Sequence, residues 1–216
     1  MFIDRLDAAR QLIPHIIHLK KKINTIVLAI PRGGLPIAAA IAHELHAPLD
    51  IILTKKIGAP YNEEFAIGAA TPAAFFLDSH YLDSQYPADP EFIKNKVQEI
   101  QELLKKRAQL YRHGAPASEL ANKTVIIVDD GVATGQTMYA AVLDIKKQHP
   151  HEIIVVTPVI SPEARELLKQ ETDEIISVIM PSDLGAIGAY YRNFEQVSDK
   201  EAAHILQSFK QGKYNI

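Results

Sequence analysis

The chain contains no cysteine among its 216 residues, which excludes disulfides, thiolate catalysis and cysteine-based zinc sites. It also lacks a basic excess: its net charge is −3 at pH 7, whereas non-specific nucleic-acid binding usually requires clustered positive charge. No apolar run approaches the ~20 residues of a membrane-spanning helix, and the first ten residues carry charges, unlike the apolar core of a secretory signal. These absences predict a cytoplasmic protein that binds neither nucleic acid nor membrane.

The composition is that of a globular chain, 47% apolar and 23% charged, and the length suits one domain over residues 1–216. Short apolar, β-branched runs alternate with segments of helical period, which predicts an α/β fold: a parallel sheet of about five strands with helices on both faces. The expected strands are residues 24–30, 50–54, 123–129, 152–160 and 174–180. The expected helices are residues 35–46, 134–148, 161–171 and 199–210.

Residues 57–112 interrupt this alternation. Glycine, proline and asparagine early in the segment 57–78, followed by two brief apolar runs, predict a loop and then a short hairpin. Asp89 and Pro90 signal the start of a long helix that ends near Arg112. Its apolar residues recur at three- and four-residue spacing, so the helix is expected to lie on the sheet or at a homodimer seam.

The run VIIVDDGVATGQT (125–137) places two adjacent carboxylates, Asp129 and Asp130, at the end of an expected strand. A Walker B strand also ends in acids, but it requires a P-loop, and no G-x-x-x-x-G-K-[ST] occurs in the chain. Ligands of open parallel sheets bind at the carboxyl ends of strands. A turn that opens into a helix binds phosphate through its N–H groups, and carboxylates accept hydrogen bonds from sugar hydroxyls. The motif therefore predicts a sugar-phosphate site.

This run resembles the signature with which type I phosphoribosyltransferases bind 5-phosphoribosyl-1-pyrophosphate (PRPP). The resemblance implies the fold of that family and assigns the ribose hydroxyls to Asp129 and Asp130. It also implies that magnesium is held mainly by PRPP oxygens and water, with no metal site made by the protein alone. The residues implied to bind the 5-phosphate are Gly131, Val132, Ala133, Thr134, Gly135, Gln136 and Thr137.

PRPP also carries a pyrophosphate, which needs a second anion site. The stretch AIPRGG (29–34) joins an expected strand to an expected helix. Gly33 and Gly34 permit close backbone approach, and Arg32 can pair with phosphate oxygens. The stretch resembles the pyrophosphate loop of the family, so these three residues are expected to bind the donor.

Lys55 and Lys56 are expected to end the second strand, at the ligand edge of the sheet. The resemblance implies that one of them reaches the pyrophosphate, with Lys56 slightly favoured over Lys55. The following stretch GAPYNEEF (58–65) is similar in position to the flexible loop that closes over PRPP. Such a lid excludes water from an oxocarbenium-like centre and so prevents hydrolysis.

The resemblance covers essentially the whole chain. The stretches KKIGAPYNEEFAIGAA and IGAYYRNFEQVSDKEAAHIL are similar to those of a bacterial subgroup of predicted phosphoribosyltransferases, some of which are fused to a dienelactone-hydrolase-like domain. In the family a variable hood binds the acceptor, and the candidate hood segments here are about 1–20 and 181–198. Tyr190, Tyr191 and Phe194 in the second segment either stack on a flat base or pack the hood itself.

The expected activity is that of a glycosyltransferase, in which a nitrogen nucleophile displaces pyrophosphate from PRPP. Ala133 stands where 6-oxopurine enzymes of the family carry an acid, which argues against hypoxanthine or guanine and leaves the acceptor open. Two alternatives stand beside this prediction: a PRPP-sensing regulator with little catalysis, and a hydrolase of PRPP or nucleotide-like substrates. The expected partners are small molecules, PRPP and its acceptor, with a homodimer left open.

Overall fold

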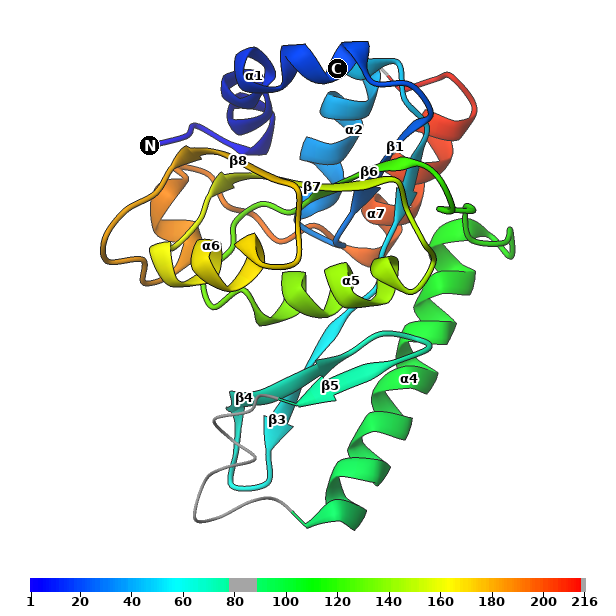
Figure 1. Cartoon of the computed structure of the whole chain (residues 1–216), viewed down its shortest axis with the longest axis vertical. Coiled ribbons are helices and arrows are strands. Elements are labelled where there is room, and N and C mark those ends of the chain that lie inside the picture. Colours follow the sequence, from blue (N-terminus) through cyan, green and yellow to red (C-terminus); the bar gives the residue numbers. More distant parts are fainter. Residues whose placement is uncertain (78–88, 215–216) are drawn as a thin grey trace.

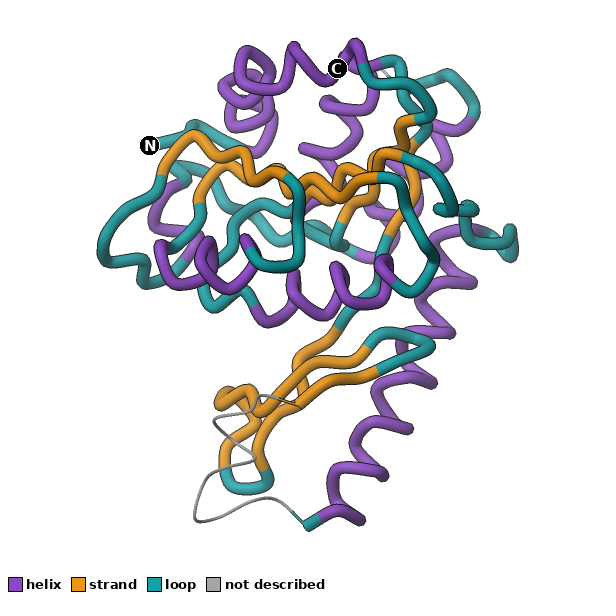
Figure 2. The backbone as a smooth tube through the Cα atoms, viewed as in Figure 1, coloured by secondary structure: helices purple, strands orange, loops and turns teal. Residues whose placement is uncertain are grey.

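The computed structural model of the chain describes residues 1–77 and 89–214. Its main sheet has five strands in the order β2-β1-β6-β7-β8, and all neighbouring pairs are parallel. Figure 2 shows this sheet as a middle layer with helices above and below it. The predicted α/β fold is therefore confirmed. The strands are β1 (Thr25–Ala29), β2 (Leu49–Ile51), β6 (Thr124–Val128), β7 (Glu152–Val159) and β8 (Glu174–Ile179).

Two apolar clusters fill the space between the main sheet and its helices. On β6, Ile126 and Val128 join one cluster while Val125 and Ile127 join the other, because successive strand residues point to opposite faces. Burial on both faces explains why the strands are almost continuously apolar. Among the described residues, no helix is long and apolar enough to span a bilayer. The first face is covered by α1 (Arg5–Ile16), α2 (Gly34–Leu45) and α7 (Asp199–Lys210), and the second by α5 (Gln136–Lys146) and α6 (Pro162–Lys169) (Figure 1).

A second, antiparallel sheet projects from the α5 side of the molecule (Figure 1). It consists of β3 (Lys55–Ala59), β4 (Asn62–Ala70) and β5 (Phe75–Leu77). The long helix α4 (Pro90–Arg112) contacts β3 and β4, and its other end packs on α7. We call these three strands and α4 the arm.

Helix α4 begins where the sequence predicts. The Asp89 carboxylate accepts the Glu91 N–H at 3.0 Å, and proline occupies the first turn. The predicted apolar face buries Val97, Ile100 and Leu104. The helix therefore lies on a sheet, as expected, but that sheet belongs to the arm.

The loop predicted before the hairpin is wrong. Residues 57–65 belong to β3, a tight turn and the beginning of β4, whereas the predicted hairpin is confirmed as β4 and β5. Gly58 lies inside β3 where the register shifts, and a Cβ there would lie 2.5 Å from the Glu63 carbonyl oxygen. This glycine therefore marks a bulge with close backbone approach, a pattern that sequence cannot separate from a loop. The last residue of the predicted hairpin segment, 78, lies outside the described residues.

The predicted second strand, 50–54, is also too long at its end. Strand β2 stops at Ile51, and Lys55 and Lys56 begin β3 of the arm instead of ending β2. The intervening Ile52 and Leu53 are buried, with exposed fractions of 8% and 5%. Their burial makes the apolar pattern continuous across the passage between the two sheets, so the pattern hides the end of β2.

The two segments expected to form the hood meet through backbone hydrogen bonds. The Phe2 N–H donates to the Tyr190 carbonyl and the Arg192 N–H donates to the Phe2 carbonyl, both at 2.8 Å. Most of the first segment forms α1, which packs on α2, β7 and β8. The Asp4 carboxylate caps α1 by accepting the Asp7 N–H at 2.8 Å, so Arg5 is the first helical residue.

Candidate active site

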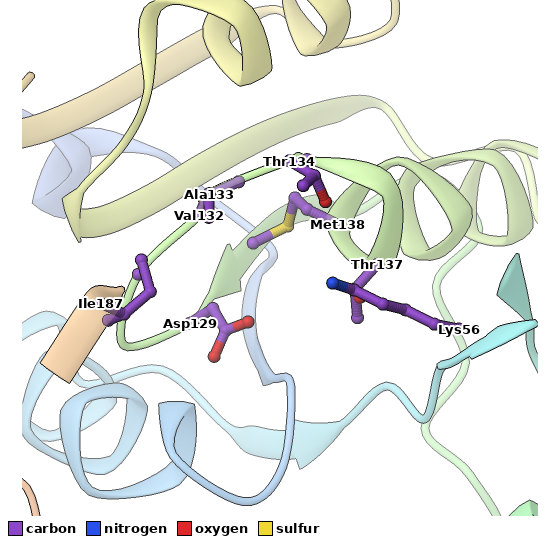
Figure 3. Close-up of a pocket in the computed structure, with 10 residues that line it drawn as sticks. Lys56, Asp129, Val132, Ala133, Thr134, Thr137, Met138 and Ile187 are labelled. Atoms are coloured by element: carbon purple, nitrogen blue, oxygen red, sulfur yellow. The ribbon is translucent and has the colours of Figure 1, made fainter. Parts of the chain in front are cut away.

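A cavity of about 170 Å³, here called the loop cavity, lies at the carboxyl end of β6 beside the start of the arm. Figure 3 shows Asp129, at the end of β6, and Lys56, from β3, on different sides of it. The structure thus brings together predicted site residues that are far apart in the sequence. The cavity is lined by Lys56, Asp129, Gly131, Val132, Ala133, Thr134, Gly135, Thr137, Met138 and Ile187.

Ser161 holds the turn between β6 and α5. Its hydroxyl donates to the Ala133 carbonyl at 2.6 Å, and its N–H donates to the Val132 carbonyl at 3.0 Å. The same hydroxyl oxygen caps α6 by accepting the Ala164 N–H at 2.9 Å. Gly135 then enters α5 with a φ of +77°, a conformation that favours glycine. Ser161 therefore holds the turn through two hydrogen bonds. The N–H groups at the start of α5 lie beside the cavity.

Asp129 is the carboxylate of the loop cavity. One of its oxygens accepts the Asp130 N–H at 2.8 Å. Burial raises the pKa of Asp129 well above its usual range, and the adjacent Asp130 charge raises it further. Its ionised form is therefore favoured by a ligand that brings hydroxyl donors or positive charge.

Asp130 has a partner that the sequence did not suggest. The Nε and Nη2 atoms of Arg5 both donate to Oδ2 of Asp130, at 2.9 and 2.8 Å. The Arg5 Nη1 atom donates to the Glu195 carbonyl at 2.7 Å, and the guanidinium carbon lies 4.1 Å from the centre of the Phe194 ring. Burial raises the pKa of Asp130, while Arg5 opposes that rise. The two adjacent carboxylates therefore have different environments.

Asp130 faces a second, more open hollow of about 470 Å³, here called the Arg5 hollow. Ile187 lines both this hollow and the loop cavity, so the two spaces are neighbours. Ile187 packs on Gly131, where a Cβ would lie 2.6 Å from its Cδ1 atom. The residues that line the hollow are Arg5, Arg32, Gly33, Asp130, Ile187, Phe194, Gln196 and Val197.

The turn after β1 packs directly against the acid pair. A Cβ at Gly33 would collide with the Asp130 carboxylate, and a Cβ at Gly34 would lie 2.6 Å from a backbone oxygen of β6. Both positions thus require glycine for close approach. The Pro31–Arg32 peptide bond is cis. The predicted pyrophosphate loop and the acidic strand end therefore form one continuous surface.

Arg32 is tied to the C-terminal part of the chain. Its Nη1 lies 3.5 Å from Oδ1 of Asp199, and the Tyr111 hydroxyl donates to the same oxygen at 2.5 Å. The Tyr111 hydrogen bond is the main cause that lowers the pKa of Asp199 below its usual value, although burial opposes it. Helices α4 and α7 thus both contribute to the position of Arg32.

The aromatic residues proposed for acceptor binding are placed unequally. The Tyr191 side chain is buried between Phe2 and Phe194, with ring centres 5.2 and 4.8 Å apart, and its hydroxyl donates to the Asp130 carbonyl at 2.6 Å. Tyr191 therefore offers no free ring face to a base in this structure. The Tyr190 hydroxyl donates to the Asp183 carbonyl at 3.3 Å, and Tyr190 lines neither cavity.

Two further predicted residues lie outside the loop cavity. Lys55 is not among its lining residues, because adjacent residues on β3 point to opposite faces and Lys56 takes the inward one. Gln136 begins α5 immediately behind the turn and does not line the cavity. The geometry thus separates the two lysines that the sequence could barely distinguish.

Besides the apolar wall residues Met138 and Ile187, two polar residues of the site, Arg5 and Ser161, were not predicted from the sequence. Arg5 lies among other charged residues near the N-terminus, and it reaches Asp130 where the N-terminal segment pairs with the segment around Tyr191. The sequence Ser-Pro-Glu at 161–163 is typical of a helix start with serine as N-cap. The hydrogen bond from Ser161 to the Ala133 carbonyl joins elements that are distant in the sequence. Neither contact has a local signal.

The described residues contain no group of three or more histidine, cysteine, aspartate or glutamate side chains suited to hold a metal ion. The loop cavity offers one carboxylate, Asp129, with hydroxyls of Thr134 and Thr137 nearby on its wall. This donor set suits a magnesium ion that keeps most of its ligands from water and substrate. It fits a cation that arrives with a phosphorylated ligand.

The comparisons with known proteins agree with this geometry. A family model described as the phosphoribosyl transferase domain matches residues 3–192, a range that includes both turns and the arm. A Mycobacterium tuberculosis protein named "Putative phosphoribosyl transferase" is 32% identical over 208 residues, which are 95% of this chain and 46% of that protein. The chain thus spans about half the length of the curated relatives that it matches.

Solved structures show the same fold. The crystal structure of TT1426 from Thermus thermophilus is 36% identical, with a TM-score of 0.81 over 96% of this chain and 98% of that one. A hypothetical protein from Neisseria gonorrhoeae, solved with bound ppGpp, is 14% identical, with a TM-score of 0.50 over 96% of each chain. From the family match together with these relatives, the chain belongs to the phosphoribosyl transferase family.

Proposed function

We propose that the chain transfers a phosphoribosyl group from PRPP to a nitrogen nucleophile and releases pyrophosphate. The observation that carries this proposal is the loop cavity, where a carboxylate, an ammonium group and a turn opening into a helix converge. A sugar phosphate uses all three features at once, since its phosphate suits the turn and its hydroxyls suit the carboxylate. The family match supports the same reaction class.

The 5-phosphate binds to the turn 131–137, whose backbone is braced by Ser161. Asp129 accepts a hydrogen bond from a ribose hydroxyl inside the loop cavity. Asp130 has one oxygen engaged by Arg5, and its other oxygen serves the neighbouring hydroxyl. The two carboxylates thus divide the ribose between the loop cavity and the Arg5 hollow.

The pyrophosphate binds between the turn after β1 and the start of the arm. Arg32 supplies a planar guanidinium, which matches phosphate oxygens bidentately, and Lys56 supplies a compact positive charge. Both charges stabilise the negative charge that builds up on pyrophosphate as it leaves. They act by fixed position, so no covalent intermediate with the protein is needed.

In the reaction, the nitrogen lone pair of the acceptor forms a bond to C1 of the ribose while the C1–oxygen bond to pyrophosphate breaks. The bonding electrons leave with pyrophosphate, and the proton lost from the acceptor nitrogen passes to solvent. We assign the exclusion of water from C1 to the β3–β4 hairpin of the arm, whose tip exposes Tyr61 and Phe65. Magnesium, when bound with PRPP, supplies positive charge to the phosphates, and Asp129 is the residue that would hold its hydration shell.

Two measurements test this function. PRPP with magnesium should raise the melting temperature of the wild-type protein, and Asp129→Asn should abolish most of that shift without unfolding the apo protein. Pyrophosphate release should then depend on an added acceptor from a panel of purines, pyrimidines, carboxylated heterocycles and small amines. Binding without any release would instead indicate a PRPP-sensing regulator, and release without an acceptor would indicate a hydrolase. Absence of binding at millimolar PRPP would contradict all three.

A further inference from the structure

The Arg5 hollow is lined by charged side chains and adjoins the proposed ribose site. It is lined by two guanidinium groups, Arg5 and Arg32, against one carboxylate, Asp130. Its volume of about 470 Å³ exceeds the about 170 Å³ of the loop cavity, and Ile187 lies on the wall that they share. Each guanidinium has a carboxylate partner: Asp130 lies 2.8 Å from Arg5, and Asp199 lies farther away, 3.5 Å from Arg32.

Arg5 is fixed in place before any ligand arrives. Its side chain is 11% exposed, and three of its five N–H groups donate to Asp130 and to the Glu195 carbonyl. The face of the guanidinium lies over Phe194, which restricts its rotation. Within the described part of the chain, the two other N–H groups have no acceptor. A guanidinium held in this way is pre-organised to bind an anionic oxygen in the hollow.

The aromatic rings beside the hollow are in contact with one another and with Arg5, although Phe194 is 36% exposed. Phe194 has Arg5 on one side, and its ring is also stacked with Tyr191 at 4.8 Å. Tyr191 is 5% exposed, and its hydroxyl is bonded to the Asp130 carbonyl. The aromatic residues therefore support Arg5 and Asp130, and recognition of the acceptor falls to the charged groups.

We infer that the acceptor carries a carboxylate or an equivalent anionic group, which binds to the two remaining N–H groups of Arg5 in the Arg5 hollow. This inference rests on the proposed function, since it names the class of molecule that receives the phosphoribosyl group. The acceptor is a nitrogen compound with an acidic substituent. Arg5 is accordingly a specificity-determining residue.

The test is a calorimetric titration with pairs of probes that differ in their negative charge, orotate with uracil and benzoate with benzamide. Each probe is titrated into the full chain at pH 7.5, with and without saturating ribose 5-phosphate. The carboxylated member of each pair should bind at least about tenfold more tightly, the size expected for a charge-assisted bidentate hydrogen bond. Equal binding within the pairs, or no carboxylate binding at millimolar concentration, would overturn the inference.

Variants of α1 separate recognition from folding. Arg5→Gln should remove the preference for the charged probe, and Arg5→Lys should retain part of it because the charge stays while the planar fork is lost. The matched control is Arg10→Gln, an exposed arginine on the same helix, which should keep the wild-type preference. If Arg5→Gln is too unstable to titrate, Arg5→Lys decides: an undiminished tenfold preference with no loss of affinity would contradict a guanidinium site.

Failure of this inference can be told apart from failure of the proposed function. The probe titrations without ribose 5-phosphate do not depend on donor binding, whereas a PRPP-induced melting shift does not depend on the acceptor. A protein that binds PRPP but shows no carboxylate preference would retain the proposed function and lose this inference. A protein with the preference but no PRPP binding would do the opposite.

Discussion

Asp129 and Asp130 are adjacent in the chain and were predicted to act together, yet the structure gives them different surroundings. Asp129 lines the loop cavity opposite Lys56, and its carboxylate accepts a hydrogen bond from a backbone N–H. Asp130 lines the Arg5 hollow and is held by two N–H groups of Arg5. Removing one partner of a buried ion pair strongly destabilises the folded state, because the other charge is left uncompensated. A buried carboxylate without a counter-charge already destabilises the folded state. The same chemical group therefore contributes oppositely to stability at two neighbouring positions.

The largest expected effect is the difference in stability between variants of the two aspartates. Asp130→Asn should lower the free energy of unfolding by about 2 kcal/mol, because the mostly buried Arg5 guanidinium loses its counter-charge. Asp129→Asn should leave it unchanged or raise it by roughly 1 kcal/mol, because a buried like charge is removed. Urea unfolding monitored by circular dichroism measures both values.

The pH dependence gives the sign of the Asp129 effect. Since the folded-state pKa of Asp129 is raised, its ionisation destabilises the folded state increasingly as pH rises from its ordinary value through the raised one. The advantage of Asp129→Asn should therefore be larger at pH 8 than at pH 4. Equal losses for the two variants at every pH would show that the carboxylates are equivalent after all.

A smaller effect tests Arg32, which lines the Arg5 hollow. Arg32→Ala should weaken pyrophosphate binding about tenfold, the loss expected for one charge-assisted phosphate contact, and change ribose 5-phosphate binding less than twofold. Titration calorimetry with each ligand provides the comparison, and Arg10→Ala on the exposed face of α1 serves as the control. Equal losses for both ligands would place Arg32 outside the pyrophosphate site.

The smallest effect concerns the support of the loop cavity. Ser161→Ala should lower the free energy of unfolding by about 1 kcal/mol through loss of the α6 cap, and it should weaken PRPP binding a few-fold because the turn is no longer braced. Asp89→Ala removes an equivalent cap from α4, away from the loop cavity, and should cost similar stability without changing PRPP affinity. If both variants lose affinity alike, the bond to the Ala133 carbonyl has no special role.

The main sheet and the helices that flank it could be predicted because their signals are local. Apolar runs indicated β1, β6, β7 and β8, and Asp89 marked the start of α4. The sequence predicted α4 and the β4–β5 hairpin of the arm but not β3. Ile52 and Leu53, which connect β2 to β3, are buried, so the apolar pattern does not show where β2 ends. Helix α1 was not predicted, because its residues were assigned to the expected hood.

The site divides in the same way. The turn 131–137 and the glycines Gly33 and Gly34 were expected from motifs that are continuous in the sequence and resemble those of the family. The structure packs both glycines against the end of β6 and the acid pair. Arg5 reaches Asp130 across 125 positions of the chain, and no local pattern encodes that contact. Lys56 lines the loop cavity and Lys55 does not. Which of the two lysines faces the cavity depends on the alternation of side chains along β3, which the sequence did not determine.

A titration of PRPP with magnesium into the wild-type protein, Lys56→Ala and Lys55→Ala tests the central claim most directly. The two lysines are adjacent and equal in charge, but only Lys56 lines the loop cavity. The wild type should bind PRPP at a single site, Lys56→Ala should bind at least about tenfold more weakly, and Lys55→Ala should stay within twofold of the wild type. No binding at millimolar PRPP, or the same loss for both lysines, would contradict the assignment of the loop cavity as the PRPP site.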